Sequence, residues 1–371
     1  MLKKAQGNMY NFVTHMQTHL GGKCSNECHY CLPEGALVLM GDYTEKPIEK
    51  IKMGEEIVGI SQDKVTGYNK FVKAKVKATM NRKAETIKIT TDDGAIECTP
   101  DHLLMGSSKA RLSGGDWKQA KAFSPRQLLK FVGIKPNDTI QQRWIGCNPF
   151  EEGWLSGYID GDGCFFKFRM NPENKKKTGF GFEAVSIDSD IRETLKEYTL
   201  KSGIQLLEGF KSSGYGKKHH MLFTRKTEQA KRLEVISRFS KDRHFDFYRG
   251  YIAGIIDAEG TILEYVRISQ HKVNSKIRER IMFSLSKLTF KYVEEEFGIR
   301  ITGGMKMRLR LLHECLPRCK RKADRLIIGH STKGCPKNII TAMEIGRETE
   351  VYNLETECNN YIANGFKVHN C

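Results

Sequence analysis

A nine-residue pattern that occurs twice is the strongest constraint on the fold of this chain. Leu155–Gly163 and Ile252–Gly260 each combine an apolar stretch, a central glycine and an acidic residue directly before a closing glycine. The copies lie about a hundred residues apart, and each is followed by strand-like alternation and then by apolar residues at helical spacing. The middle of the 371-residue chain therefore predicts an α+β domain with two similar halves.

Small residues in each copy predict how the two halves meet. Gly157 and Gly254 allow two helices to approach closely, and a closing glycine suits the end of each helix. Two such helices side by side would bring Asp162 and Glu259 together. Like carboxylates are costly at short range unless a cation lies between them, and their oxygen atoms suit Mg²⁺. The pattern thus predicts a magnesium site at the ends of paired helices.

Apolar spacing predicts the order of elements in each half. In the first half we expect a helix at Gly153–Ile159, strands at Cys164–Arg169 and Gly181–Ile187, a helix at Asp188–Lys201 with Asp188 or Ser189 as N-cap, strands at Ile204–Phe210 and His220–Thr224, and a helix at Thr227–Phe239. In the second half we expect a helix from Phe247, strands at Thr261–Ser269 and Arg280–Ser284, and a helix at Lys287–Phe297. Asp160 and Asp257 are interpreted as structural capping groups.

The doubled pattern resembles the LAGLIDADG homing endonucleases over roughly residues 141–330. The resemblance implies two pseudo-symmetric αββαββα halves whose sheets form a saddle over the major groove of double-stranded DNA. It also implies that Asp162 and Glu259 hold the Mg²⁺ ions that activate water for phosphodiester hydrolysis. An auxiliary active-site lysine is usual in such enzymes, but spacing does not place it here.

Both ends of the chain are rich in short strands. The first part shows strand patterns at Ala36–Leu39, Ile57–Ile60, Phe71–Met80, Glu85–Thr90 and, after the Asp93–Gly94 turn, Ala95–Cys98. The last part shows Val351–Leu354 and a hairpin of Tyr361–Ala363 and Phe366–His369 around Asn364–Gly365. We expect the two ends to form one all-β domain, into which the repeat region is inserted.

One cysteine position appears twice. Cys31 closes a run with Cys24 and Cys28, and the chain ends on Val368–Cys371. Removal of residues 31–370 would join Tyr30 to Cys371 and rebuild the same run. A segment that begins with Cys, ends with His-Asn and is followed by Cys has the chemical groups needed to remove itself.

These ends resemble an intein, over roughly residues 31–140 and 331–371. The matching motifs are Cys31–Pro33, the T-x-x-H pattern Thr99–His102, and the final blocks Val351–Glu357 and Tyr361–Cys371. The resemblance implies an all-β Hint fold in which residues 31–140 and 331–370 are the two parts of the splicing domain.

The same resemblance implies a reaction and its catalytic groups. The Cys31 thiol attacks the Tyr30 carbonyl in an N–S acyl shift, with His102 as proton donor to the departing amine and Thr99 polarising the carbonyl. Cys371, the first residue of the C-extein, then attacks the thioester. Asn370 cyclises with assistance from His369, and no cofactor is required. Flanking host segments and the intein-free host gene are the partners that this implies.

Two positions depart from the intein pattern. Asn353 stands where inteins commonly have Asp, and Asn359 lies near where they often have His. An asparagine side chain cannot serve as a general acid or base. The sequence leaves open how far these residues slow splicing.

Residues 1–30 with Cys371 resemble the start of a radical SAM enzyme. The resemblance implies that Cys24, Cys28 and Cys371 hold a [4Fe–4S] cluster in the spliced host, with S-adenosylmethionine as its partner. Zinc binding by Cys24, Cys28, His29 and Cys31 is the alternative.

A second group of possible ligands lies at the end of the repeat region. It comprises His313, Cys315, Cys319, His330 and Cys335. Their spacing fits no standard zinc finger, and thiols on loops are the favoured interpretation.

Composition limits the class of protein. The 61 basic and 44 acidic residues give a net charge of +17, which suits a polyanionic partner such as nucleic acid. No run of 18 apolar residues and no secretory signal are present, so we expect no membrane span and a cytoplasmic location. We also expect a monomer. Eleven cysteines then predict thiols or metal ligands instead of a disulfide framework.

Two alternative functions remain open on the sequence. An autoprocessing domain could cleave without ligating, although cleavage alone needs no Cys371. A LAGLIDADG maturase could bind nucleic acid without cutting it, but it would not require a β-rich shell with terminal Cys and Asn.

Overall fold

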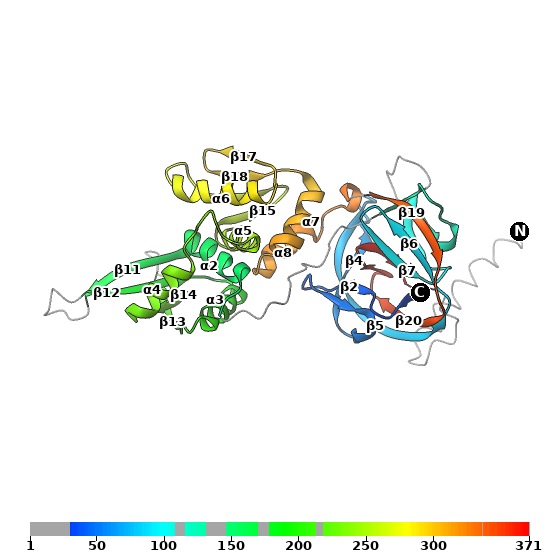
Figure 1. Cartoon of the computed structure of the whole chain (residues 1–371), viewed down its shortest axis with the longest axis horizontal. Coiled ribbons are helices and arrows are strands. Elements are labelled where there is room, and N and C mark those ends of the chain that lie inside the picture. Colours follow the sequence, from blue (N-terminus) through cyan, green and yellow to red (C-terminus); the bar gives the residue numbers. More distant parts are fainter. Residues whose placement is uncertain are drawn as a thin grey trace, which may run out of the picture. The chain divides into compact units, whose positions relative to one another are not determined.

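The computed structural model describes residues 30–107, 116–130, 146–169, 178–212, 218–335 and 337–370 (Figure 1). The chain divides into two compact units. The outer unit comprises residues 1–135 and 331–371, and the inserted unit comprises residues 136–330. Each unit is described by itself below. Among the described residues, no helix is both long and apolar enough to cross a bilayer.

The outer unit is built from curled antiparallel sheets. One has the strand order β1-β20-β5-β4, and the larger has the order β3-β2-β21-β22-β8-β10-β19-β6-β7, with β9 added beside β8. The strands are β1 (Leu32–Pro33), β2 (Leu37–Leu39), β3 (Glu45–Pro47), β4 (Glu56–Gln62), β5 (Asn69–Ala84), β6 (Ile87–Thr91), β7 (Gly94–Cys98), β8 (Leu103–Ser107), β9 (Asp116–Gln119), β10 (Leu128–Lys130), β19 (Lys337–Ile345), β20 (Thr349–Thr356), β21 (Asn360–Ala363) and β22 (Phe366–His369).

Strand pairing brings sequence-distant parts of the outer unit together. β1 pairs with β20, with Leu32 opposite Tyr352. β22 pairs with β8, with Val368 opposite Leu104. As expected from the sequence, β21 and β22 form a hairpin, whose turn has positive φ at Asn364 (47°) and Gly365 (78°).

The core of the outer unit draws apolar side chains from both ends of the chain. Its buried members include Leu32, Val38, Ile57, Val76, Ile89, Ile96, Leu104, Leu129, Ile340, Leu354, Tyr361, Phe366 and Val368. Burial of this apolar surface fixes the register of the strands on which the terminal motifs lie.

The inserted unit combines helices with sheets of orders β11-β12-β14-β13 and β15-β16-β18-β17. Its elements are α2 (Pro149–Asp162), β11 (Gly163–Arg169), β12 (Thr178–Val185), α3 (Ser189–Lys201), β13 (Leu207–Ser212), β14 (Lys218–Thr224), α4 (Thr227–Ile236), α5 (Phe245–Glu259), β15 (Gly260–Ile262), β16 (Val266–Ser269), α6 (Ser275–Lys287), β17 (Tyr292–Glu295), β18 (Gly298–Ile301), α7 (Gly304–Cys315) and α8 (Lys320–Ile327).

Helices α2 and α5 pack with almost no space between their backbones. A Cβ added to Gly157 would lie 2.1 Å from the Tyr251 carbonyl oxygen. One added to Gly254 would lie 2.1 Å from the Trp154 carbonyl oxygen. Any larger residue at either position would push the helices apart, so the prediction of close helix approach from the small residues is confirmed.

The predicted elements of the first half agree with the structure, but three predictions in the second half are wrong. Arg280–Ser284 lies inside helix α6, and Lys287–Phe297 contains strand β17 where a helix was expected. Thr261–Ser269 is two strands, β15 and β16, not one. In helix α6 the buried residues include Ile281, Ser284 and Leu285, which recur at the spacing of a helix face. The short apolar run in this segment suggested a strand instead.

Candidate functional sites

The first site surrounds Cys31 in the outer unit. Cys31 is buried, at 2% exposure, directly before β1. Its backbone N–H donates to Thr99 Oγ1 at 3.1 Å, and the Thr99 N–H donates to the Cys31 carbonyl oxygen at 3.0 Å. Thr99 therefore contacts the nitrogen of the Tyr30–Cys31 peptide bond. Polarisation of the Tyr30 carbonyl by Thr99 stays a prediction.

His102 lies on the same turn as Thr99 and is fully buried. The His102 N–H donates to the Thr99 carbonyl oxygen at 3.0 Å, which fixes this turn. His102 Nδ1 lies 3.2 Å from the Cys31 carbonyl oxygen. The imidazole thus contacts the carbonyl group of Cys31, the residue on the C-terminal side of the Tyr30–Cys31 peptide bond.

Tyr30 connects the two ends of the segment in space. Its ring centre lies 6.1 Å from that of His102 and 6.2 Å from that of His369. Both contacts are edge-to-face. Residues that lie more than 300 positions apart in sequence therefore share one site.

The side chain of Asn370 is held in a completely buried position. Asn370 Nδ2 donates to the Leu354 carbonyl oxygen at 2.7 Å and to Thr356 Oγ1 at 3.2 Å. Its backbone N–H donates to the Asn359 carbonyl oxygen at 3.2 Å. Its carbonyl oxygen is hydrogen-bonded to His369 Nδ1. The contacts to the amide and to the backbone N–H come from β20 and the following turn, whereas the contact to the carbonyl comes from β22.

His369 has an environment that favours its neutral form. Burial lowers the pKa of His369, and the hydrogen bond to Asn370 opposes this in part. The Trp117 ring, on β9, lies edge-to-face with the imidazole, with ring centres 5.0 Å apart and planes at 84°. A neutral imidazole can either donate or accept a proton at neutral pH.

Asn353 and Asn359, the departures from the intein pattern, occupy different surroundings. Asn353 is fully buried, and its Oδ1 accepts the Leu354 N–H at 2.9 Å. Asn359 has a positive φ of 56° in the turn after β20, which suits asparagine. Its carbonyl oxygen accepts the hydrogen bond from the Asn370 backbone N–H, so Asn359 contributes to the site through its backbone and not through its side chain.

The second site lies at the ends of α2 and α5 in the inserted unit. Burial raises the pKa of Asp162, and Lys322 opposes the rise. Burial likewise raises the pKa of Glu259, and the charge of Asp162 raises it further. A Cβ added to Gly161, beside Asp162, would lie 3.1 Å from Glu259 Cγ, so the ends of the two helices bring these carboxylates near each other. Two neighbouring carboxylates are a donor set that fits Mg²⁺, because a divalent cation removes their repulsion.

Lys322, on α8, lies beside this carboxylate pair and is 9% exposed. Its Nζ donates to the carbonyl oxygens of Ile256 (2.9 Å), Asp257 (2.6 Å) and Ala258 (3.1 Å), at the last turn of α5. Burial lowers the pKa of Lys322. Lys322 thus donates hydrogen bonds to the last carbonyl oxygens of α5, which have no donor within the helix, and thereby positions Glu259.

Asp257 and Asp160 were expected to be capping groups, and only Asp257 fits this, since it accepts backbone N–H groups directly before α8, whereas Asp160 accepts side-chain donors and caps no helix among the described residues. Asp257 is buried and accepts hydrogen bonds from Trp154 Nε1 (2.8 Å) and from the N–H groups of Arg318 (2.7 Å) and Cys319 (3.0 Å). Burial raises the pKa of Asp257 to about 6, and these donors oppose the rise.

Asp160 binds across the two halves. It accepts the Tyr251 hydroxyl at 2.8 Å and Arg280 at 2.6 Å. The aspartates of the two copies therefore differ in role: Asp160 joins helices, and Asp257 anchors the segment that leads into α8.

The remaining ligand predictions have separate outcomes. Cys24, Cys28, His29 and Cys371 lie outside the described residues. Among the described residues, His313, Cys315, Cys319, His330 and Cys335 form no shared metal-ligand cluster, and Cys315 is buried in α7, not on a loop. Asp188, Asp190 and Cys319 do lie together, but Asp188 is paired with Arg321 and Asp190 accepts the Lys320 N–H.

Sequence reasoning missed several residues of these sites. Trp117 and Lys322 carry no motif of their own, and Leu354 and Thr356 lie inside the block Val351–Glu357, which gave no sign that they hold Asn370. Each contributes through a position that depends on strand register or on the packing of α8. The T-x-x-H pattern gave no information on the residues that hold Asn370.

Comparisons with known proteins give distant structural neighbours. No family model matches the chain, and no curated protein matches it. Variants of the homing endonuclease I-DmoI match with a TM-score of 0.38 and 14% identity, covering 45% of this chain and 96% of theirs. A mutant of the Ssp DnaB mini-intein matches with a TM-score of 0.32 and 10% identity, covering 92% of this chain and 98% of that one. A bacterial intein-like domain from Clostridium thermocellum matches with a TM-score of 0.23 and 20% identity, covering 28% of this chain and 67% of that one.

Proposed function

We propose that residues 31–370 are an intein that excises itself and ligates the flanking host segments, and that its inserted unit is a homing endonuclease. The observation that carries the splicing proposal is the meeting of Tyr30, Cys31, His102, His369 and Asn370 in one buried site. The motifs noted in the sequence supply the reaction.

The first step is the N–S acyl shift. The Cys31 sulfur bonds to the Tyr30 carbonyl carbon, and the bond from that carbon to the Cys31 nitrogen breaks as the nitrogen gains a proton. Thr99 holds the N–H of this nitrogen, so it aligns the leaving group. His102 is the nearby group proposed to deliver the proton. Cys371 then takes the acyl group from Cys31 in a thioester exchange.

The last step is cyclisation of Asn370. Its Nδ2 attacks its own backbone carbonyl carbon, the bond to Cys371 breaks, and the Cys371 nitrogen takes the proton. His369 Nδ1 is bonded to the oxygen of that carbonyl, where it stabilises the developing negative charge. Leu354 and Thr356 hold the Nδ2 atom until attack. The freed amine of Cys371 then attacks the Tyr30 thioester carbonyl carbon, the bond from that carbon to the Cys371 sulfur breaks, and a normal peptide bond and the Cys371 thiol result.

The nuclease proposal rests on the carboxylate pair. Asp162 and Glu259 would hold Mg²⁺, which activates a water molecule and stabilises the leaving oxygen in phosphodiester hydrolysis. Lys322 keeps the end of α5 in place beneath Glu259. The substrate would be double-stranded DNA of the intein-free host gene.

The host proposal rests on sequence alone. The rebuilt run of Cys24, Cys28 and Cys371 would bind a [4Fe–4S] cluster that works with S-adenosylmethionine. Anaerobic reconstitution of the ligated host with iron and sulfide tests this, because a zinc site would give no cluster absorption.

A mass spectrum tests splicing directly. The full chain is fused after Cys371 to a protein of known mass and expressed, with Cys31→Ala as the test variant and Cys164→Ala as the control thiol. Splicing predicts a ligated host and a free segment in the parent and in the control. Cleaved but unligated ends in the parent would favour the autoprocessing alternative. Unchanged products from Cys31→Ala would refute the mechanism.

DNA cleavage is tested separately. Purified protein with Mg²⁺ should cut DNA that spans the intein-free host gene, and Asp162→Asn should not. Glu193→Gln, which removes an exposed carboxylate of α3, is the matched control. Sequence-selective binding to RNA with no DNA cleavage would instead favour the maturase alternative.

A further inference from the structure

The two sheets of the inserted unit each pack one face against helices. In the first sheet, Phe182 and Leu222 are buried on the face that α4 contacts. In the second, Ile268 and Ile299 are buried on the face toward α5. The opposite faces consist of partly or fully exposed side chains, and strand register determines which residues these are.

The open face of the first sheet is mostly apolar. Register places on it Phe166, Phe168, Val185, Leu207, Met221 and Phe223, which we call the apolar face, together with Cys164, His219 and the Glu183–Lys211 pair. Phe166 pairs with Gly181, and Phe168 pairs with Gly179. A Cβ on Gly181 would lie 2.8 Å from Phe166 Cζ, and one on Gly179 would lie 2.5 Å from Phe168 Cζ. The rings therefore lie flat over the neighbouring strand.

Cations surround the apolar face. The Arg225 guanidinium lies 5.7 Å from the centre of the Phe168 ring. Arg169 and Lys218 are exposed at the strand ends, and Lys211 is paired with Glu183 within the face. An apolar surface with a positive border suits a polyanion that carries apolar groups between its charges.

The open face of the second sheet is largely polar. Thr261, Arg267 and Arg300 lie in one row across three strands, and the exposed Val293 of β17 continues this row beside Arg300. Glu295 binds both arginines through their Nε atoms, at 3.3 Å for Arg267 and 2.7 Å for Arg300. We call Thr261, Arg267, Arg300 and Glu295 the arginine face.

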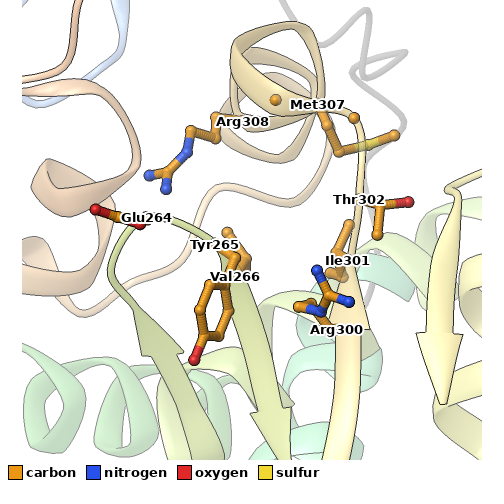
Figure 2. A pocket seen from close by; sticks show the side chains of 10 residues that line it. Glu264, Tyr265, Val266, Arg300, Ile301, Thr302, Met307 and Arg308 are labelled. Carbon is orange, nitrogen blue, oxygen red and sulfur yellow. The ribbon is translucent and has the colours of Figure 1, made fainter. Parts of the chain in front are cut away.

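The arginines of this face are held with their terminal nitrogens available. Within the described residues, no hydrogen bond involves the terminal nitrogens of Arg267 or Arg300, and the Arg300 hydrogen bond to Glu295 uses Nε. Tyr265 lies 5.8 Å from the Arg300 guanidinium, and Figure 2 shows both side chains lining one pocket below Arg308 of α7. Arg308 itself is bonded to the Leu263 carbonyl oxygen and so stabilises the adjacent loop.

We propose that the two halves of the inserted unit recognise chemically different half-sites of one DNA duplex. The apolar face contacts thymine methyl groups in the major groove, and the arginine face donates to guanine O6 and N7. Phenylalanine and other apolar groups are the side chains that contact the thymine methyl, whereas two terminal nitrogens of an arginine fork match the guanine edge. This inference rests on the proposed DNA binding and adds the base chemistry of each half.

Base analogues separate the two faces. The full chain carrying Cys31→Ala selects its sites from a random duplex library without Mg²⁺. In the selected duplex, thymine is replaced by deoxyuridine, or guanine by 7-deazaguanine, in one half-site at a time. Loss of a contacted methyl group should weaken binding about 4-fold. Loss of N7 should weaken binding about 2- to 12-fold per contacted guanine, and only in the other half-site.

Side-chain variants assign each half-site to a face. Phe168→Ala should abolish the deoxyuridine effect, and Phe168→Leu should retain part of it because it stays apolar. Arg300→Ala should abolish the 7-deazaguanine effect. Phe210→Ala is the matched control, since Phe210 is an exposed ring of the same sheet on the opposite face. Thermal unfolding of each variant separates loss of contact from loss of fold.

Each outcome decides the proposal. Equal effects of deoxyuridine in both half-sites, or effects that persist in Phe168→Ala, would overturn it while leaving DNA binding intact. Self-association that disappears in Phe168→Ala, without any methyl dependence, would show that the apolar face binds a second copy and would also overturn it. Absence of any selective DNA binding by the parent would refute the proposed nuclease itself.

Discussion

The site around Cys31 and the site at Asp162 use opposite physical means. In the outer unit, buried neutral groups are fixed by hydrogen bonds to the backbone, and reactivity depends on bringing distant residues together. In the inserted unit, two carboxylates are forced together near Lys322, and reactivity depends on charge. A neutral, pre-positioned site needs no cofactor, whereas a repulsive pair needs a cation. Each site should therefore fail without disturbing the other.

The largest effect is expected for Asn370→Ala. Without Nδ2 no nucleophile remains for cyclisation, so release of the Cys371 side should fall below detection. Thioester formation at Cys31 should continue and be trapped by an added thiol. Mass spectrometry of the products, with DNA cleavage assayed in parallel, checks both claims. Lost DNA cleavage in this variant would show that the two sites are not independent.

Asp162→Asn is the reverse experiment. It removes one charge of the metal-binding pair, and DNA cleavage should fall at least ~10³-fold, since metal stabilisation of the developing charge is worth several kcal/mol. Mg²⁺ binding measured by calorimetry should weaken in parallel. Splicing should proceed at the parent rate. Cleavage that persists within tenfold of the parent would remove the role assigned to Asp162.

His102→Ala tests the first step alone. Loss of a proton donor should slow the N–S acyl shift about 10²- to 10⁴-fold. Thiol-induced cleavage at Tyr30, followed by gel densitometry, reports this step. Cyclisation of Asn370 should continue, because none of its contacts includes His102. If both steps slowed equally, the shared Tyr30 contact would be coupling them.

The pH dependence of cyclisation should distinguish the two sites further. Burial lowers the pKa of His369, so the neutral form persists below the ordinary histidine pKa of about 6.5. The rate should hold as pH falls through 6.5 and decline only at lower pH, where the folded protein protonates His369. Product release from a thiol-cleaved sample, followed from pH 8 to 5, measures this. A midpoint above 6.5 would contradict the proposed state of His369.

How much of these sites the sequence predicted depends on the range of the interactions involved. The hairpin around Asn364 and the close packing at Gly157 followed from local rules on turns and small residues. The assignments at Arg280–Ser284 and Lys287–Phe297 failed because short apolar runs fit either a strand or a helix until packing decides. Lys322 was invisible for a different reason: α8 reaches the end of α5 only through tertiary contacts with Asp257.

Trp117 shows the same limit and offers the smallest predicted effect. It lies on β9, and only the pairing of β9 with β8 brings its edge to His369. An edge-to-face contact contributes about 0.5–1.5 kcal/mol, so Trp117→Ala should slow cyclisation about 2- to 12-fold while leaving thioester formation unchanged. Trp117→Phe should recover most of the rate because it retains an aromatic edge. Equal slowing of both steps would mean that Trp117 supports the fold of β9 and does not position the imidazole.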